Sequence, residues 1–179
     1  MRYGSPRTTK PSVEPSKPPP HSKNLRLRRW SDASATFFIT KSLQPKKPIL
    51  DAQTRAVVVS AFRFAVDANR IYLRAFVVMP DHWHALFALR KPWTLPKFMH
   101  DMMSFVGRKI NPLLRMHNTA WQDSYYDTHV KTMKQFEYVA YYIEQNPVVK
   151  GLVNSPEEWD ASSASCTDAV NDPWLLLYD

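Results

Sequence analysis

The spacing of hydrophobic and polar residues divides the chain into seven elements of secondary structure. Short apolar runs bounded by turn-forming residues predict strands, and apolar residues at i, i+3, i+4 and i+7 predict helices. We expect strands at residues 35–43, 71–79, 82–89 and 121–131, and helices at residues 50–69, 95–114 and 134–145. The order β-α-β-β-α-β-α predicts an α+β domain: a ferredoxin-like antiparallel sheet with helices packed on one face.

Pro80-Asp81 separates the two middle strands, which predicts a β-hairpin with a tight turn. His82 and His84 begin the second strand of this hairpin, and side chains at i and i+2 of a strand point to the same face. Both imidazoles therefore project together, whereas Trp83 points the other way. Two imidazoles on one rigid strand provide half of a site for a divalent metal ion. The alternative is a hairpin that carries two unrelated histidines.

The last predicted helix, residues 134–145, places a tyrosine and an amide side by side. Its apolar stripe is formed by Phe136, Val139, Ala140 and Ile143. Tyr142 and Asn146 lie one turn apart on one flank of that stripe, where a hydroxyl and an amide oxygen could face a metal held by another element. Alternatively, Tyr142 is an ordinary boundary aromatic and Asn146 ends the helix before Pro147, which disfavours its continuation.

Length and charge indicate one domain with two terminal extensions. The net charge is +8, and residues 1–30 carry nearly all of it, with eight Lys or Arg against one acid and six prolines. We expect residues 1–30 to form a disordered basic tail, residues 31–159 to fold, and residues 160–179 to form a C-terminal segment. The tail is either a solubilising extension or a source of non-specific attraction to phosphate. Within it, the residues that we expect to contact DNA are Arg26, Arg28 and Arg29.

Composition also excludes several classes of function. The chain has three glycines, so it contains neither a P-loop nor a dinucleotide fingerprint, and we expect no nucleotide cofactor. No apolar run is long enough to span a bilayer and no signal peptide opens the chain, so we expect no membrane partner. The single Cys166 excludes an internal disulfide and suits a reducing cytosol.

Two segments, VVMPDHWHALFAL and YYIEQNPVVKGLV, together resemble the single-tyrosine HUH transposases, in particular the REP-associated tyrosine transposases with their transposase IS200-like domain. The resemblance extends from about residue 28 to residue 159. It includes a Phe-rich first strand at residues 36–40 and a Trp-Gln pair before a Tyr-rich strand at residues 121–127. Two positions depart from the family: Asp81 replaces the usual Asn, and His129 comes one residue late, on the opposite strand face.

The resemblance implies a metal-dependent enzyme that cleaves and rejoins single-stranded DNA at hairpin-forming repeats. Tyr142 would be the nucleophile that forms a 5′-phosphotyrosine link, and His82 and His84 would bind Mg²⁺ or Mn²⁺. We expect Asn146 to be the third metal ligand, with Gln145 as the alternative. Such a protein would lie in the bacterial cytoplasm, associated with the nucleoid when bound to DNA. On the surface, Lys131 and Lys134 are candidates to contact DNA phosphates.

Alternative functions follow from the same residues. A domesticated protein could bind DNA hairpins without any chemistry. A small metal-dependent hydrolase could activate water with Asp81 or Asp127 as the base. A structural zinc site is disfavoured, because one cysteine and scattered histidines give no four-ligand pattern. We favour a monomer, and a dimer is the alternative.

Overall fold

The computed structural model describes residues 35–171. The basic tail with Arg26, Arg28 and Arg29, and the residues after position 171, lie outside this described part. Four strands and three α-helices alternate along the chain: β1 (Thr36–Ser42), α1 (Ala52–Asp67), β2 (Ile71–Val78), β3 (His82–Leu89), α2 (Leu95–Leu113), β4 (Tyr126–Val130) and α3 (Met133–Val149). Within the described residues, no helix is both long and apolar enough to cross a membrane.

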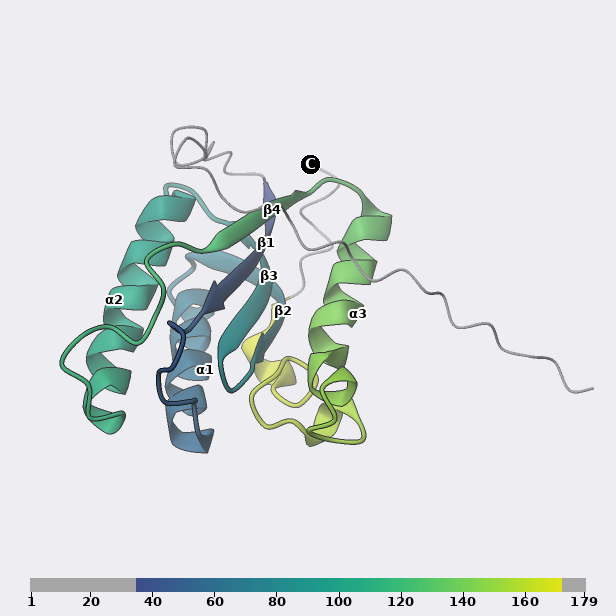
Figure 1. The fold of residues 1–179 in the computed structure, drawn as a ribbon. Helices are drawn as coiled ribbons and strands as arrows, with labels where there is room; N and C mark the ends of the chain where they lie inside the picture. Colours follow the sequence, from purple (N-terminus) through teal and green to yellow (C-terminus); the bar gives the residue numbers. More distant parts are fainter. Residues whose placement is uncertain (1–34, 172–179) are drawn as a thin grey trace, which may run out of the picture.

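The four strands form one antiparallel sheet in the order β2-β3-β1-β4. This is the strand order of a ferredoxin-like β-α-β-β-α-β unit, so the predicted α+β class and the antiparallel sheet are confirmed. β1 lies between β3 and β4, which brings the first strand beside the hairpin strand that carries the histidines (Figure 1). β2 and β4 form the two edges of the sheet.

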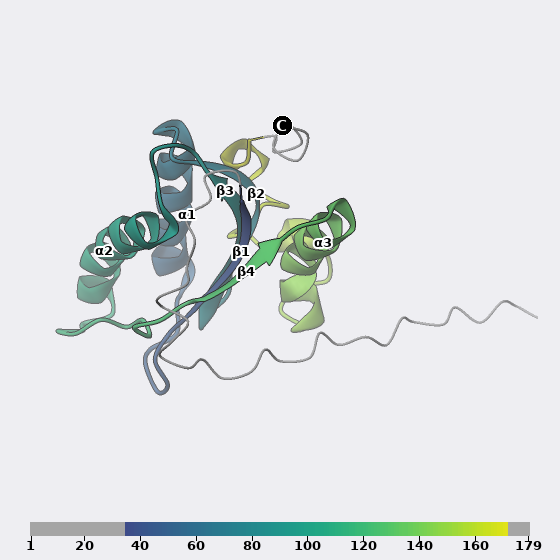
Figure 2. The same cartoon turned by 90° about the horizontal axis from the view of Figure 1, so that it is seen from above.

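The helices cover both faces of the sheet, so the expectation that they all pack on one face is wrong. Figure 2 shows α1 and α2 on one side and α3 on the other. Side chains alternate along β3, and both of its faces are apolar. Trp83 lies against Phe62 of α1, whereas Leu86, which is fully buried, points toward the side of α3. Because each apolar face must be removed from water, the third helix covers the face that α1 and α2 leave open.

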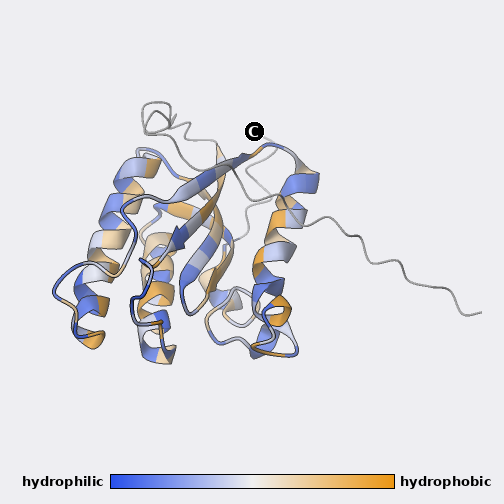
Figure 3. Ribbon diagram, viewed as in Figure 1, coloured by the Kyte–Doolittle hydropathy of each residue, from blue (hydrophilic) through white to orange (hydrophobic). Residues whose placement is uncertain are grey.

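Aromatic side chains fill the core between the sheet and the first two helices. The ring centroid of Phe62 lies 5.3 Å from those of Phe76 and Trp83, and Phe87 of β3 lies 5.1 Å from Phe98 of α2. Each helix carries both hydrophobic and hydrophilic residues, as expected for helices that turn one face to a sheet (Figure 3). The predicted orientation of Trp83, away from the histidines, is confirmed.

The fourth strand is shorter than the predicted 121–131. Trp121 forms an isolated bridge with Leu43, and regular pairing starts at Tyr126. Between these two points, the Nζ atom of the buried Lys41 donates hydrogen bonds to the carbonyl oxygens of Gln122 and Ser124. The Lys41 side chain therefore hydrogen-bonds to backbone carbonyl groups that would otherwise pair with β1 in a continuous strand.

Helix α3 extends four residues beyond its predicted end at position 145. Pro147 lies inside the helix, which ends at Val149 with Lys150 as the C-cap, and the next residue, Gly151, has a φ of +68°. The Gly151 N–H donates to the Val148 carbonyl, and the Leu152 N–H donates to the Pro147 carbonyl. This is a Schellman motif, in which glycine adopts the left-handed conformation that ends a helix. A proline removes one helical hydrogen bond, but the glycine determines where this helix stops.

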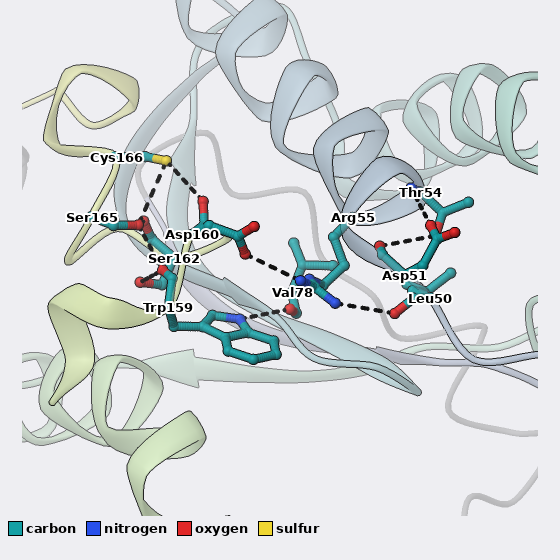
Figure 4. Close-up of polar contacts among 10 residues, drawn as sticks. All are labelled: Leu50, Asp51, Thr54, Arg55, Val78, Trp159, Asp160, Ser162, Ser165 and Cys166. Carbon is teal, nitrogen blue, oxygen red and sulfur yellow. Dashed lines mark hydrogen bonds and ion pairs between the residues drawn. The ribbon is translucent and has the colours of Figure 1, made fainter. Parts of the chain in front are cut away.

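The segment after α3 returns to the free edge of β2 (Figure 4). The Val78 N–H donates to the Ala161 carbonyl, and the indole Nε1 of Trp159 donates to the Val78 carbonyl at 3.0 Å. The Arg55 guanidinium of α1 lies 4.5 Å from the ring centroid of Trp159 and donates to Asp160. These contacts cover an edge that would otherwise expose unpaired backbone groups.

Candidate active site

His82 and His84 lie at the start of β3 and point to the side of the sheet that carries α3. Their ring centroids are 4.6 Å apart, and their Nε2 atoms face each other at 3.1 Å. The strand geometry therefore produces the predicted pair. One proton or one cation between the two nitrogens would satisfy both of them.

Both histidines are oriented by a hydrogen-bond partner at the other ring nitrogen. The Nδ1 atom of His82 donates to the Asp81 carboxylate at 2.6 Å, which leaves Nε2 with a free lone pair. The Nδ1 atom of His84 lies 2.8 Å from the hydroxyl oxygen of Thr40 on β1. Such partners fix the ring orientation of metal-binding histidines. Sequence reasoning did not assign these roles to Asp81 and Thr40.

Burial keeps the inner histidine neutral. His84 is 6% exposed, and its desolvation, together with the charge of the neighbouring His82, lowers its pKa from 6.5 to about 3. A neutral imidazole offers a lone pair, which is the form that binds metal ions. His84 is therefore a ready nitrogen ligand throughout the physiological pH range.

Tyr142 of α3 lies directly beside this pair. Its ring centroid is 5.6 Å from that of His84 and 6.1 Å from that of Phe38 on β1. The rings of Tyr142 and Phe38 are perpendicular to each other. Tyr142 is half-buried, whereas Tyr138 and Tyr141 are 51% and 64% exposed. Among the three tyrosines of α3, Tyr142 has the ring contact with a histidine.

The amide candidates lie one turn beyond Tyr142. Asn146 is buried at 5% exposure, inside the helix and not at its end, and Gln145 is half-buried. Within residues 35–171, no group of three or more His, Cys, Asp or Glu side chains could hold a metal ion. A third protein ligand to the histidine pair would therefore come from another residue type, such as these amides.

A polar clamp on the opposite flank of α3 ties the helix to β2. Glu144 accepts hydrogen bonds from Arg74 of β2 at 3.4 Å and from the Ser163 hydroxyl at 3.1 Å. Glu144 and Tyr142 lie about 200° apart around the helix axis. With one flank tied to β2, the other flank turns Tyr142 toward β1 and His84. Because the partners are far apart in sequence, no local pattern indicated this clamp.

The other predicted residues are not brought to the histidines. Lys131 is exposed between β4 and α3, and Lys134 is exposed in the first turn of α3, about 12 Å before Tyr142 along the helix axis. His129 lies 4.7 Å from Phe37, on the opposite face of the sheet, as its position in the strand predicted. Asp127 is paired with Ile39 and shares that opposite face, which removes it as a base for the alternative hydrolase.

A cavity of about 510 Å³ lies on the α2 side of the sheet, away from this site. It is lined by one face of α2 and by residues 119–125, with the cations Lys41 and Arg108 at its wall. It contains none of the four residues His82, His84, Tyr142 and Asn146. The histidine pair and this cavity therefore lie on opposite faces of the sheet.

The structure therefore places a helix-borne tyrosine beside two histidines of a hairpin strand. Residues 37–146 match the family described as transposase IS200 like, and the chain belongs to this family. It is similar to the REP-associated tyrosine transposase of Escherichia coli strain K12, with 25% identity over 140 residues that cover 76% of this chain and 80% of the relative. The structure is also similar to that of a REP-associated tyrosine transposase bound to a REP hairpin. That match has a TM-score of 0.63, 20% identity, and coverage of 76% of this chain and 80% of the other.

Proposed function

We propose that this protein is a metal-dependent endonuclease and transposase that cleaves and rejoins single-stranded DNA through a 5′-phosphotyrosine intermediate at hairpin-forming repeats. The observation that carries the proposal is the position of Tyr142, whose ring lies 5.6 Å from His84. Membership of the IS200-like transposase family supports the reaction type. The hairpin-bound relative supports hairpin DNA as the substrate.

In the proposed cleavage step, the Tyr142 oxygen forms a bond to the phosphorus atom of a backbone phosphate. The bond from that phosphorus to the 3′-oxygen of the preceding nucleotide breaks, the phenol loses its proton, and the leaving oxygen gains one to become a 3′-hydroxyl. Rejoining is the reverse attack by a 3′-hydroxyl on the phosphotyrosine. Because one phosphate ester is exchanged for another, no ATP is required. This agrees with a sequence that lacks a P-loop.

The residues of the site fit a divalent cation. The Nε2 atoms of His82 and His84 are 3.1 Å apart, a separation that suits neighbouring nitrogen ligands with bonds of about 2.1 Å. Their Nδ1 atoms are occupied by Asp81 and Thr40. We propose Asn146 as the third ligand, with Gln145 as the alternative, and Mg²⁺ or Mn²⁺ as the metal. A bound cation would neutralise charge on the phosphate during the attack.

A denaturing-gel assay tests the proposal. Labelled single-stranded DNA that contains a hairpin-forming repeat is incubated with Mn²⁺, Mg²⁺ or EDTA and with wild type, Tyr142→Phe or Tyr141→Phe. We expect a protein–DNA adduct with wild type and with Tyr141→Phe in the presence of metal. Because imidazole suits Mn²⁺ better than Mg²⁺, Mn²⁺ should support at least as much adduct as Mg²⁺. Tyr142→Phe should bind the DNA without forming an adduct.

The other outcomes assign other functions. An adduct that persists in Tyr142→Phe would move the nucleophile to another residue. Cleavage by wild type without any covalent adduct would favour a hydrolase that uses water. Hairpin binding without cleavage would favour a catalytically silent DNA-binding protein. An adduct that forms equally well in EDTA would remove the metal from the mechanism.

A further inference from the structure

The sheet face that carries the histidines is only partly covered by α3. The helix packs on β2 and β3, where Val77 and Leu86 are fully buried. Beside it, two cross-strand pairs of β1 and β4 on the same face are half-buried or exposed. These residues, which we call the β1–β4 surface, are Phe38, Thr40, Tyr126 and Thr128. The β1–β4 surface therefore forms a half-buried floor beside Tyr142, with Thr128 exposed.

The flank of α3 beside this floor carries a line of three side chains. Lys134, Tyr138 and Tyr142 follow i, i+4, i+8 spacing, so Tyr138 lies about 40° and Lys134 about 80° around the helix axis from Tyr142. The contact between Tyr142 and Phe38 shows that Tyr142 faces β1, whereas Glu144 on the opposite flank is tied to β2. Tyr138 has 51% of its surface exposed although it lies only four residues, about 6 Å along the helix axis, before Tyr142.

An exposed aromatic ring next to a nucleophile has a clear use in single-strand binding. Every base has a π-face, so aromatic side chains stack on unpaired bases with little regard to sequence, while basic residues follow the backbone. In a duplex both faces of each internal base are already stacked, so such a ring selects a single strand. Lys134, one turn before Tyr138, would place a positive charge at a backbone phosphate.

We propose that the single strand to be cut lies on the β1–β4 surface, with an unpaired base beside the scissile phosphate stacked on Tyr138 and a nearby phosphate held by Lys134. This inference rests on the proposed function, because it takes Tyr142 as the point of cleavage. Tyr138 is then a substrate-positioning residue. Tyr141 is 64% exposed and lies about 100° around the helix from Tyr142, beyond Tyr138 in the same direction, and it takes no part.

Equilibrium binding to the full-length protein tests this assignment without any cleavage. A fluorescein-labelled single-stranded oligonucleotide with a hairpin-forming repeat and adjacent unpaired bases is titrated in EDTA, and fluorescence anisotropy gives the Kd. The variants are Tyr138→Ala, Tyr138→Phe, Tyr141→Ala and Thr128→Glu, each checked for wild-type thermal unfolding. The same oligonucleotide annealed to its full complement serves as the duplex probe.

We expect Tyr138→Ala to weaken single-strand binding about 5- to 100-fold, the range expected for the loss of one base–aromatic stack. Tyr138→Phe keeps the ring and should bind like wild type, as should Tyr141→Ala. Thr128→Glu, which places a negative charge on the β1–β4 surface, should weaken the same binding. Affinity for the duplex should not change in the Tyr138 and Tyr141 variants.

Wild-type affinity in Tyr138→Ala and Thr128→Glu, or an equal loss in Tyr141→Ala, would overturn the inference. The adduct assay separates this failure from failure of the proposed function. If wild type forms the adduct but Tyr138→Ala binds the strand as tightly as wild type, the proposed nuclease stands and the stacking site is refuted. If wild type forms no adduct but Tyr138→Ala binds the strand more weakly than wild type, the stacking site stands and the proposed nuclease is refuted.

Discussion

The hydroxyl oxygen of Thr40 lies 2.8 Å from the Nδ1 atom of His84, and the two residues face each other across neighbouring antiparallel strands. The contact fixes the ring of a buried histidine so that its Nε2 atom points to His82. It joins the first strand of the domain to the proposed metal site. Its consequences for metal binding can be measured directly.

Replacing Thr40 with valine should weaken Mn²⁺ binding by about 10- to 100-fold, because the partner that orients a metal-binding histidine is lost. Isothermal titration of Mn²⁺ into the protein gives the Kd. Thr128→Val is the matched control, because Thr128 is exposed on the same face of the sheet, one strand further from the histidines. Equal losses in the two variants would show that the contact does not matter for the metal.

Asp81 should be replaceable by asparagine but not by alanine. The Asp81 carboxylate accepts the hydrogen bond from the Nδ1 atom of His82, and an asparagine amide oxygen can accept the same bond. We expect Asp81→Ala to lose about 10-fold or more in Mn²⁺ affinity. Asp81→Asn should stay much closer to wild type. If asparagine were as damaging as alanine, the negative charge of Asp81 would be the important property.

The metal-free protein should lose stability as the pH falls from about 6.5 toward about 3. Burial lowers the pKa of His84 from 6.5 to about 3, so within this window the unfolded chain binds a proton that the folded protein does not. Protons then favour unfolding, with a slope of up to about 1.4 kcal/mol per pH unit for one proton. Above pH 6.5 this contribution no longer changes with pH.

Urea unfolding in EDTA at a series of pH values between 7 and 4 measures that slope. His84→Gln should show a shallower pH dependence than wild type, because the titrating group is gone. His117→Gln, at an exposed position, should keep the wild-type slope. A wild-type slope in His84→Gln would mean that other groups cause the acid sensitivity.

Two glycine substitutions should change stability in opposite directions. Gly151 has a φ of +68°, so Gly151→Ala should lower the free energy of unfolding by about 1 kcal/mol. Gly107 lies inside α2, and an added Cβ there would meet no atom within 4 Å. Gly107→Ala should raise the free energy of unfolding by about 0.5–1 kcal/mol, the helix-propensity difference. Urea denaturation measures both, and a loss of stability in Gly107→Ala would contradict the open space around it.

Much of the fold follows from local patterns. The alternation around Pro80-Asp81 predicted the hairpin and the common face of His82 and His84, because the side-chain period of a strand is fixed by its backbone. The order of elements predicted the antiparallel sheet. The end of α3 was predicted wrongly, since Pro147 was taken as the stop although Gly151 carried the stronger signal.

The sequence by itself determined the strands and helices, the shared face of the two histidines and the flank of α3 that carries Tyr142. Those properties depend on residues within a few positions of one another. Only the tertiary structure decided that α3 covers the second face of the sheet, that Thr40 holds His84 from 44 residues away, and that Glu144 turns Tyr142 toward the histidines. The physical reason is that these contacts join segments that are far apart in the sequence, and no local pattern relates such segments. The burial of both sheet faces brings them together.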